Sequence, residues 1–179
     1  LRDNPSAKIN HHHENFFKTW WRMSYQRDEL MNLLGTLPRY IACVRTTKRP
    51  IFELIDSDIH PNDALQVFPL SDNYSFGLLQ STIHWEWFCA KCSTLKNDWR
   101  YTSNTVFDSF PWPQYPEKKW VRSVADLALE LWQTRRKIMD EHGWSLRQLY
   151  RLVEQTPTNP VTMAQNKLDA VVRKAYGMK

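Results

Sequence analysis

Three short runs of β-branched and aromatic residues predict β-strands in the first half of the chain. Residues 39–44 and 51–55 are such runs, and the polar turn 45–49 between them is typical of a β-hairpin. Residues 65–70 form a third run, which follows a turn-rich connection. The pattern therefore predicts a small sheet in this part of the chain.

Apolar residues recur at helical spacing on both sides of the predicted sheet. Before it, an amphipathic segment begins at residues 16–21 and continues to Leu34, where Gly35 and Pro38 end it. After it, a single apolar helix is expected from Tyr74 onward, because one face collects Phe76, Leu79, Ile83 and Trp87. A helix that is apolar over so much of its surface is expected to pack against the sheet.

The next part of the chain is polar, then β-forming, then rich in proline. Residues 93–100 predict a loop, and residues 101–110 predict a loop followed by a strand. The prolines at 111, 113 and 116 predict a stiff, extended crossing.

Helical spacing returns at Lys119 and predicts three short helices that form a small bundle. Gly143 ends the first helix, the pair Ser145 and Gln148 forms a capping box for the second, and Asn159 caps the third. We therefore expect an α+β protein. Its expected parts are a linker over 1–15, a mixed α/β domain over 16–113, and a helical domain over 114–179.

Chain length and composition are typical of a soluble globular protein. The 179 residues are 42% hydrophobic with only four glycines, which argues against disordered and fibrous classes. No run approaches the roughly 20 apolar residues of a membrane span, so no membrane partner is expected. The chain begins at Leu1 rather than methionine, which indicates a fragment of a longer protein. Nine tryptophans suit aromatic clusters or a surface that docks another protein.

Cysteine and histidine positions give little support to a metal site. Three cysteines are too few for a disulfide scaffold, so we expect a reducing, cytoplasmic setting. Cys89 and Cys92 form one CxxC pair, to which only His84 and the histidines at 11–13 could add ligands. A packed turn explains this pair better than a metal site. His84 itself suits a core position better than a catalytic role.

Charge is distributed unevenly along the chain, although the net value is only +5. Residues 1–50 carry nine basic and four acidic groups, residues 51–113 carry three and eight, and residues 114–179 carry twelve and seven. The densest basic cluster is the hairpin turn. Its side chains are of the types that contact DNA phosphates, namely Arg45, Thr47, Lys48 and Arg49. A solvated hairpin tip that binds nothing is the alternative.

No catalytic constellation is recognisable in the sequence. It contains no Gly-rich nucleotide loop, no GxSxG elbow, no HExxH and no paired acid motif. Asp56, Asp58 and Asp63 lie in a turn-rich segment, where aspartate is expected to form local hydrogen bonds. We therefore expect no catalytic residue, no metal and no cofactor in this fragment.

An ordered set of short motifs resembles one known family, the MmeI-like DNA methyltransferases, which are large bacterial restriction and modification enzymes. The similar part is their target-recognition region and C-terminal tail. The motifs are Arg39-Tyr40-Ile41-Ala42, Phe76-Gly77-Leu78-Leu79-Gln80-Ser81, Arg100-Tyr101-Thr102, Phe110-Pro111-Trp112-Pro113 and Leu168-Asp169-Ala170-Val171-Val172.

The resemblance implies a cytoplasmic bacterial parent enzyme that methylates adenine in double-stranded DNA with S-adenosylmethionine. This fragment is then expected to choose the DNA sequence, with the methyltransferase domain of the same parent chain as its partner. The family's catalytic Asn-Pro-Pro-Tyr motif is absent here. Whether the parent also cuts DNA stays open.

The resemblance also places base choice in the loop that holds Lys96, Asp98 and Arg100. Lysine and arginine donate to guanine O6 and N7, and aspartate accepts from the cytosine amine. Because a loop that mixes donors with a carboxylate penalises the wrong base, we expect these three side chains to read bases. The alternatives are a solvated loop with local ion pairs, and a Trp-rich protein-docking module without a nucleic-acid role.

Overall fold

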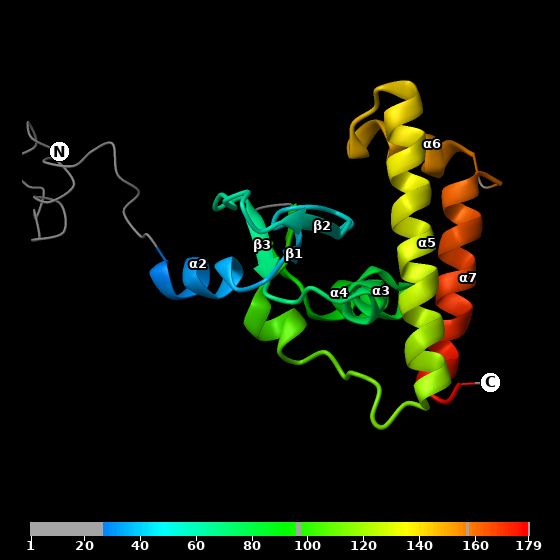
Figure 1. The fold of residues 1–179 in the computed structure, drawn as a ribbon, viewed down its shortest axis with the longest axis horizontal. Coiled ribbons are helices and arrows are strands. Elements are labelled where there is room, and N and C mark those ends of the chain that lie inside the picture. Colours follow the sequence, from blue (N-terminus) through cyan, green and yellow to red (C-terminus); the bar gives the residue numbers. More distant parts are fainter. Residues whose placement is uncertain (1–26, 96–97, 157, 179) are drawn as a thin grey trace, which may run out of the picture.

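The computed structural model describes residues 27–95, 98–156 and 158–178 (Figure 1). It has the expected α+β composition, with a small sheet at its centre and two long helices on one side. Figure 1 shows two further helices between the sheet and this long pair. The predicted linker 1–15, the start of the amphipathic segment at 16–21 and the histidines at 11–13 lie outside the described residues.

The central sheet has three antiparallel strands, as the sequence predicts. Strands β1 (Arg39–Val44), β2 (Glu53–Asp56) and β3 (Leu65–Phe68) are arranged in the order β2-β1-β3. The register pairs Ile41 with Leu54 on one side and with Phe68 on the other. The predicted hairpin is confirmed, and its connecting turn projects from one end of the sheet.

Alternate residues of β1 point to opposite faces of the sheet, and each set belongs to a different hydrophobic cluster. Tyr40 and Ala42 pack with Leu34 of helix α2 (Asp28–Gly35), while Ile41 and Cys43 belong to the main core. Helix α2 ends where the sequence predicts, and Thr36 Oγ1 donates to Leu33 O at 2.7 Å in its last turn.

The predicted single helix from Tyr74 is wrong, because the structure contains two helices, α3 (Asn73–Gln80) and α4 (Thr82–Lys91). Ser81 between them has extended backbone angles, with φ −71° and ψ 158°. Its hydroxyl donates to Leu78 O at 2.7 Å and accepts from His84 N at 3.3 Å. One serine therefore ends the first helix and caps the second, and the apolar spacing alone does not reveal this.

The segment after α4 also differs from its prediction. The expected loop 93–100 contains a two-stranded ribbon, β4 (Ser93–Leu95) and β5 (Asp98–Arg100). The expected strand within 101–110 is instead a short π-helical turn, η1 (Ser103–Phe107). Trp87 Nε1 donates to Val106 O at 3.1 Å and ties this turn to α4. Tertiary contact thus overrides the strand preference of its β-branched residues.

The C-terminal helices begin and end at the predicted signals. Helix α5 (Lys118–His142) stops at Gly143, which has φ 62°, and α6 (Leu146–Gln155) begins with the Ser145 capping box. Helix α7 (Pro160–Ala175) is capped by Asn159. With 25 residues, α5 is not short as predicted, and Figure 1 shows it running antiparallel to α7.

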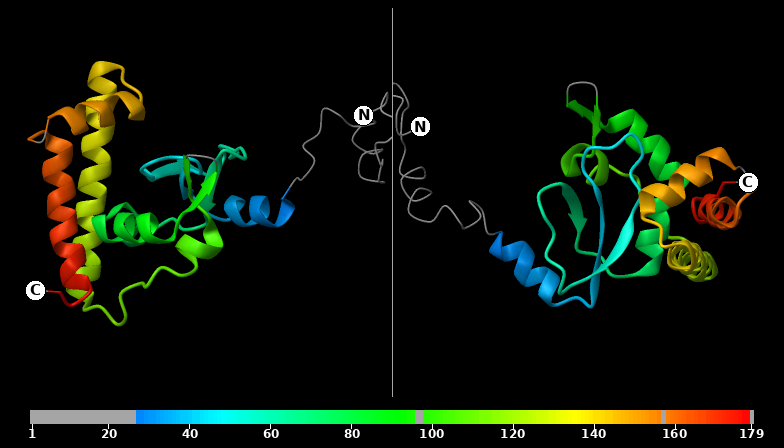
Figure 2. Two further views of the ribbon diagram at one scale, coloured as in Figure 1. Left: turned by 180° about the vertical axis from the view of Figure 1, so that it is seen from behind. Right: turned by 90° about the horizontal axis from the view of Figure 1, so that it is seen from above.

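One hydrophobic core joins the helical segment to the rest of the chain. Phe76 and Leu78 of α3 share a buried cluster with Val124 and Leu131 of α5 and with Leu168 of α7. The view from above in Figure 2 shows α5 and α7 beside the helices that cover the sheet. The division into domains at residue 113 stays a prediction. Within the described part of the chain, no helix combines the length and the apolar character needed to span a bilayer.

Candidate nucleic-acid interface

The turn between β1 and β2 pairs with β5, so two clusters that are far apart in the sequence become one surface. Thr47 N donates to Trp99 O at 3.0 Å, and Tyr101 N donates to Arg45 O at 2.7 Å. Thr46 and Arg100 form an antiparallel bridge between these hydrogen bonds. The basic turn and the charged ribbon therefore form a continuous edge of paired backbone.

The predicted phosphate-contacting residues occupy different positions on this edge. Lys48 and Arg49 are exposed at the tip, whereas Arg45 is half-buried and donates through Nη2 to Leu65 O at 3.3 Å. The Thr47 hydroxyl donates to Arg49 O at 2.9 Å and accepts from Arg49 N at 3.3 Å. The tip is therefore a locally hydrogen-bonded turn that presents two cations to solvent.

Two of the three predicted base-reading residues lie next to this turn. Asp98 is exposed at the start of β5, and Arg100 is half-buried at its end. Lys96 lies outside the described residues. Arg100 is bridged to Thr46, so the structure places one predicted base reader directly beside the predicted phosphate contacts.

A cavity of about 300 Å³ opens where the end of β1, the start of β3 and β5 meet. Two guanidinium-bearing residues and one acid line it, together with small and β-branched residues: Val44, Arg45, Thr46, Asp63, Ala64 and Arg100. Sequence reasoning assigned Asp63 only to a turn and gave Ala64 no role. No local pattern identifies them, because they reach this cavity through the antiparallel pairing of β1 with β3.

An aromatic cluster supports the surface from behind. The Trp99 ring lies 5.9 Å from the ring of Trp85 and 6.0 Å from that of Phe88, measured between centroids. The Arg49 guanidinium carbon lies 5.9 Å from the Trp85 centroid, within the range of a cation–π contact. These large side chains hold the turn and the ribbon against α4.

Comparison with known proteins identifies the family of the part of the chain that carries this surface. A family model described as the MmeI target recognition domain matches residues 26–114. Residues 26–114 are therefore a member of the MmeI target recognition domain family. The predicted turn, the ribbon and the cavity all lie inside this recognition domain, whereas helices α5 to α7 follow it.

Two relatives extend beyond the recognition domain. DNA methyltransferase A of Bacillus subtilis (strain 168) is 29% identical over 132 residues, which is 70% of this chain and 14% of that protein. The solved structure of the type IIL restriction-modification enzyme MmeI in complex with DNA matches with a TM-score of 0.67 at 20% identity. That match covers 96% of this chain and 22% of the MmeI chain, so the shared fold includes the C-terminal helices. The chain spans less than a quarter of either relative.

His84 occupies a core position, as predicted. His84 is fully buried, and its Nε2 lies 3.1 Å from the Tyr101 hydroxyl. Burial lowers the pKa of its imidazole from 6.5 to about 3, so the ring is neutral near pH 7. His84 therefore links α4 to the residue that follows β5.

The two cysteines of the CxxC pair lie at the end of α4. Cys89 is exposed, Cys92 is half-buried, and burial raises the pKa of both thiols. Among the described residues, no three His, Cys, Asp or Glu side chains gather closely enough to hold a metal ion.

Proposed function

We propose that this chain reads DNA sequence for a bacterial adenine-specific DNA methyltransferase that belongs to a restriction-modification system. The observation that carries the proposal is the pairing of the 45–47 backbone with 99–101 inside a target recognition domain. This pairing brings a basic turn and a mixed-charge ribbon to one edge. Phosphate contacts position a protein on duplex DNA and base contacts specify sequence, so adjacent groups of both kinds suit a reader.

In this proposal the residues divide into two roles. Arg45, Thr47, Lys48 and Arg49 contact the DNA backbone, and Lys96, Asp98 and Arg100 contact base edges. Thr47 would contribute its position in the turn more than its hydroxyl, because that hydroxyl is already hydrogen-bonded to Arg49. Asp63 is added to the second group because it lines the same cavity as Arg100.

The parent enzyme is proposed to transfer the methyl group from S-adenosylmethionine in a separate methyltransferase domain of the same chain. Support comes from the likeness to DNA methyltransferase A and from the small share of that protein that this chain spans. The duplex would lie between that domain and the edge formed by the turn and the ribbon.

Methylation mapping of host DNA tests the base-reading assignment. The full-length protein and its Lys96→Ala/Asp98→Ala/Arg100→Ala variant are expressed in a strain without other adenine methylation, and modified positions are read by single-molecule sequencing. We expect the variant to methylate a relaxed or different motif. An unchanged motif at unchanged efficiency would remove these residues from the reading role.

A Trp-rich protein-docking module is the second candidate. It is favoured by an exposed groove of about 550 Å³ between the proline-rich crossing and the end of α7, lined by apolar groups that include Trp112, Tyr115, Trp120 and Met178. Salt-dependent retention on duplex DNA separates the two functions. A full-length protein that duplex DNA does not retain even at low salt would favour docking over reading.

A further inference from the structure

Arg135 is a fully buried arginine on α5, although the sequence places it beside two other basic residues near the end of an amphipathic helix. A run of basic residues on a helix is typical of a solvated face, but Arg135 has no access to solvent. A guanidinium without solvent access can find hydrogen-bond partners only within the protein. Arg135 Nε has none, so the partners of its two Nη atoms show what it holds in place.

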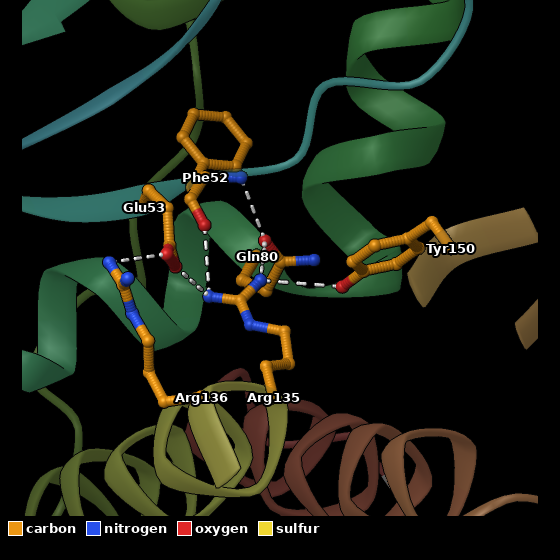
Figure 3. A network of polar contacts seen from close by, with 6 residues as sticks. All are labelled: Phe52, Glu53, Gln80, Arg135, Arg136 and Tyr150. Carbon is orange, nitrogen blue, oxygen red and sulfur yellow. Dashed lines mark hydrogen bonds and ion pairs between the residues drawn. The ribbon is translucent and has the colours of Figure 1, made fainter. Parts of the chain in front are cut away.

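Its partners come from three separate parts of the chain (Figure 3). Nη2 donates to Phe52 O at 3.0 Å and lies 2.7 Å from Glu53 Oε1. Nη1 lies 3.3 Å from the Tyr150 hydroxyl and 3.5 Å from Gln80 Oε1. One side chain on α5 thus connects the start of β2 to the last residue of α3 and to α6.

Phe52 is the point where the two strands of the hairpin separate. Pairing between β1 and β2 ends at Ala42 and Glu53. Beyond it, Phe52 N donates to Gln80 Oε1 at 2.9 Å, while Phe52 O accepts from Arg135. Both backbone polar groups of Phe52 are therefore occupied by α3 and α5, and the segment before it is directed away from β1.

The other end of the same segment is held by β5, through the hydrogen bonds of Arg45 and Thr47 with residues 99–101. Hydrogen bonds therefore hold the basic turn at both of its ends. Those at one end go to β5, and those at the other end are made by the backbone of Phe52. A buried ion pair contributes little net stability compared with apolar packing, but its directional bonds define one geometry. We infer that Arg135 is a positioning residue, which fixes the shape of the 45–51 turn and thereby the placement of Lys48 and Arg49 on DNA. This inference rests on the proposed function.

A double-mutant cycle with Lys48 tests the inference in the full-length protein. Affinity for duplex DNA is measured across a range of salt concentrations for the wild type, Lys48→Ala, Arg135→Gln and the double variant. In the wild-type background, Lys48→Ala is expected to reduce the slope of log affinity against log salt by about 1, the value for one lost phosphate contact. In the Arg135→Gln background, the same substitution is expected to change the slope by about 0.

Arg136→Gln is the matched control. Arg136 bonds the same carboxylate through Glu53 Oε2 at 3.0 Å, but its side chain is 42% exposed and it makes no described hydrogen bond to Phe52. In this background, Lys48→Ala is expected still to reduce the slope of log affinity against log salt by about 1. General destabilisation lowers the folded fraction and leaves the slope change caused by Lys48→Ala intact, so the cycle separates positioning from stability.

Gln80→Met keeps the test decisive if Arg135→Gln does not fold. It removes the acceptor of the Phe52 N–H without changing any charge, and it is expected to abolish the Lys48 effect in the same way. A slope change of about 1 from Lys48→Ala in either folded background would overturn the inference alone. Absence of salt-dependent binding in the wild type would instead overturn the proposed function, and the inference with it.

Discussion

The backbone N–H of Thr47 lies 3.0 Å from the carbonyl oxygen of Trp99, and this hydrogen bond joins two segments that are 52 positions apart in the numbering. It places the basic turn and the charged ribbon on one edge of the recognition domain. Since the ribbon is also attached to the aromatic cluster of α4, the relative position of the two charged groups is set by the core.

Lys48→Ala is expected to weaken binding of the full-length protein to all duplex sequences by a similar factor. Lys48 is exposed at the tip of the basic turn, the part of the edge proposed to contact phosphates. Fluorescence anisotropy at several salt concentrations should give a slope reduced by about 1. Lys118→Ala, at the exposed start of α5, is the control and should leave the slope unchanged. A change of preferred sequence in Lys48→Ala would contradict the backbone role.

Arg100→Gln is expected to alter recognition at one base pair of the target and to leave the others unchanged. The half-buried guanidinium borders the cavity at the strand junction, and loss of a bidentate contact costs about 1 to 3 kcal/mol of discrimination. Competition binding with duplexes substituted at each position measures the effect. Arg122→Gln, on the exposed surface of α5, serves as the control. An equal loss at every position would instead indicate a phosphate contact.

Gly77→Ala is expected to destabilise the protein by about 1 to 3 kcal/mol, because α3 lies directly on α5 at this residue. An added Cβ would lie 2.9 Å from both Ala128 Cβ and Val124 Cγ1, and 3.3 Å from Leu168 Cδ1. Gly35→Ala is the matched control, since no atom lies within 4 Å of its added Cβ. Urea denaturation of both variants checks the prediction. Equal stability of the two variants would show that α3 can move away from α5 at little cost.

His84 is expected to make the protein less stable as the pH falls below 6.5. Its folded-state pKa of about 3 lies below the usual value of 6.5, so in this range the unfolded chain binds a proton that the native imidazole does not. The contribution of neutral His84 to the free energy of unfolding is therefore fully present above pH 6.5. It decreases toward pH 3 by about 1.4 kcal/mol per pH unit. Denaturant unfolding at pH 7, 5.5 and 4.5 measures it.

The control for this prediction is His84→Phe combined with Tyr101→Phe, which removes the titrating ring and its hydroxyl partner together. The double variant keeps two aromatic rings in the cluster around Phe52 and Phe110. Its stability should depend less steeply on pH than that of the wild type, because every other group that titrates between pH 4.5 and 7 is retained. If stability depended on pH equally steeply in the two proteins, His84 would take up its proton over the same pH range in the native and the unfolded states.

Much of the secondary structure follows from the sequence because its signals are local. The capping box at Ser145, the Asn159 cap and Gly143 define helix ends through hydrogen bonds and backbone angles within a few residues. The β-branched runs likewise predict the hairpin and the third strand. The predictions failed for two different reasons. The turn η1 is fixed by a tertiary hydrogen bond from Trp87, whereas α3 and α4 are divided by the local capping bonds of Ser81, which the continuous apolar spacing conceals.

The charged residue types needed for DNA recognition, and the segments that carry them, are already determined by the sequence. Only the tertiary structure brings the 45–49 turn to β5, adds Asp63 to the cavity and buries Arg135 under the hairpin. The physical reason is that antiparallel pairing and ion pairs between distant residues depend on how helices and strands pack. A buried and a solvated arginine have the same local sequence signature, and only packing against Phe52, Glu53 and Gln80 distinguishes them.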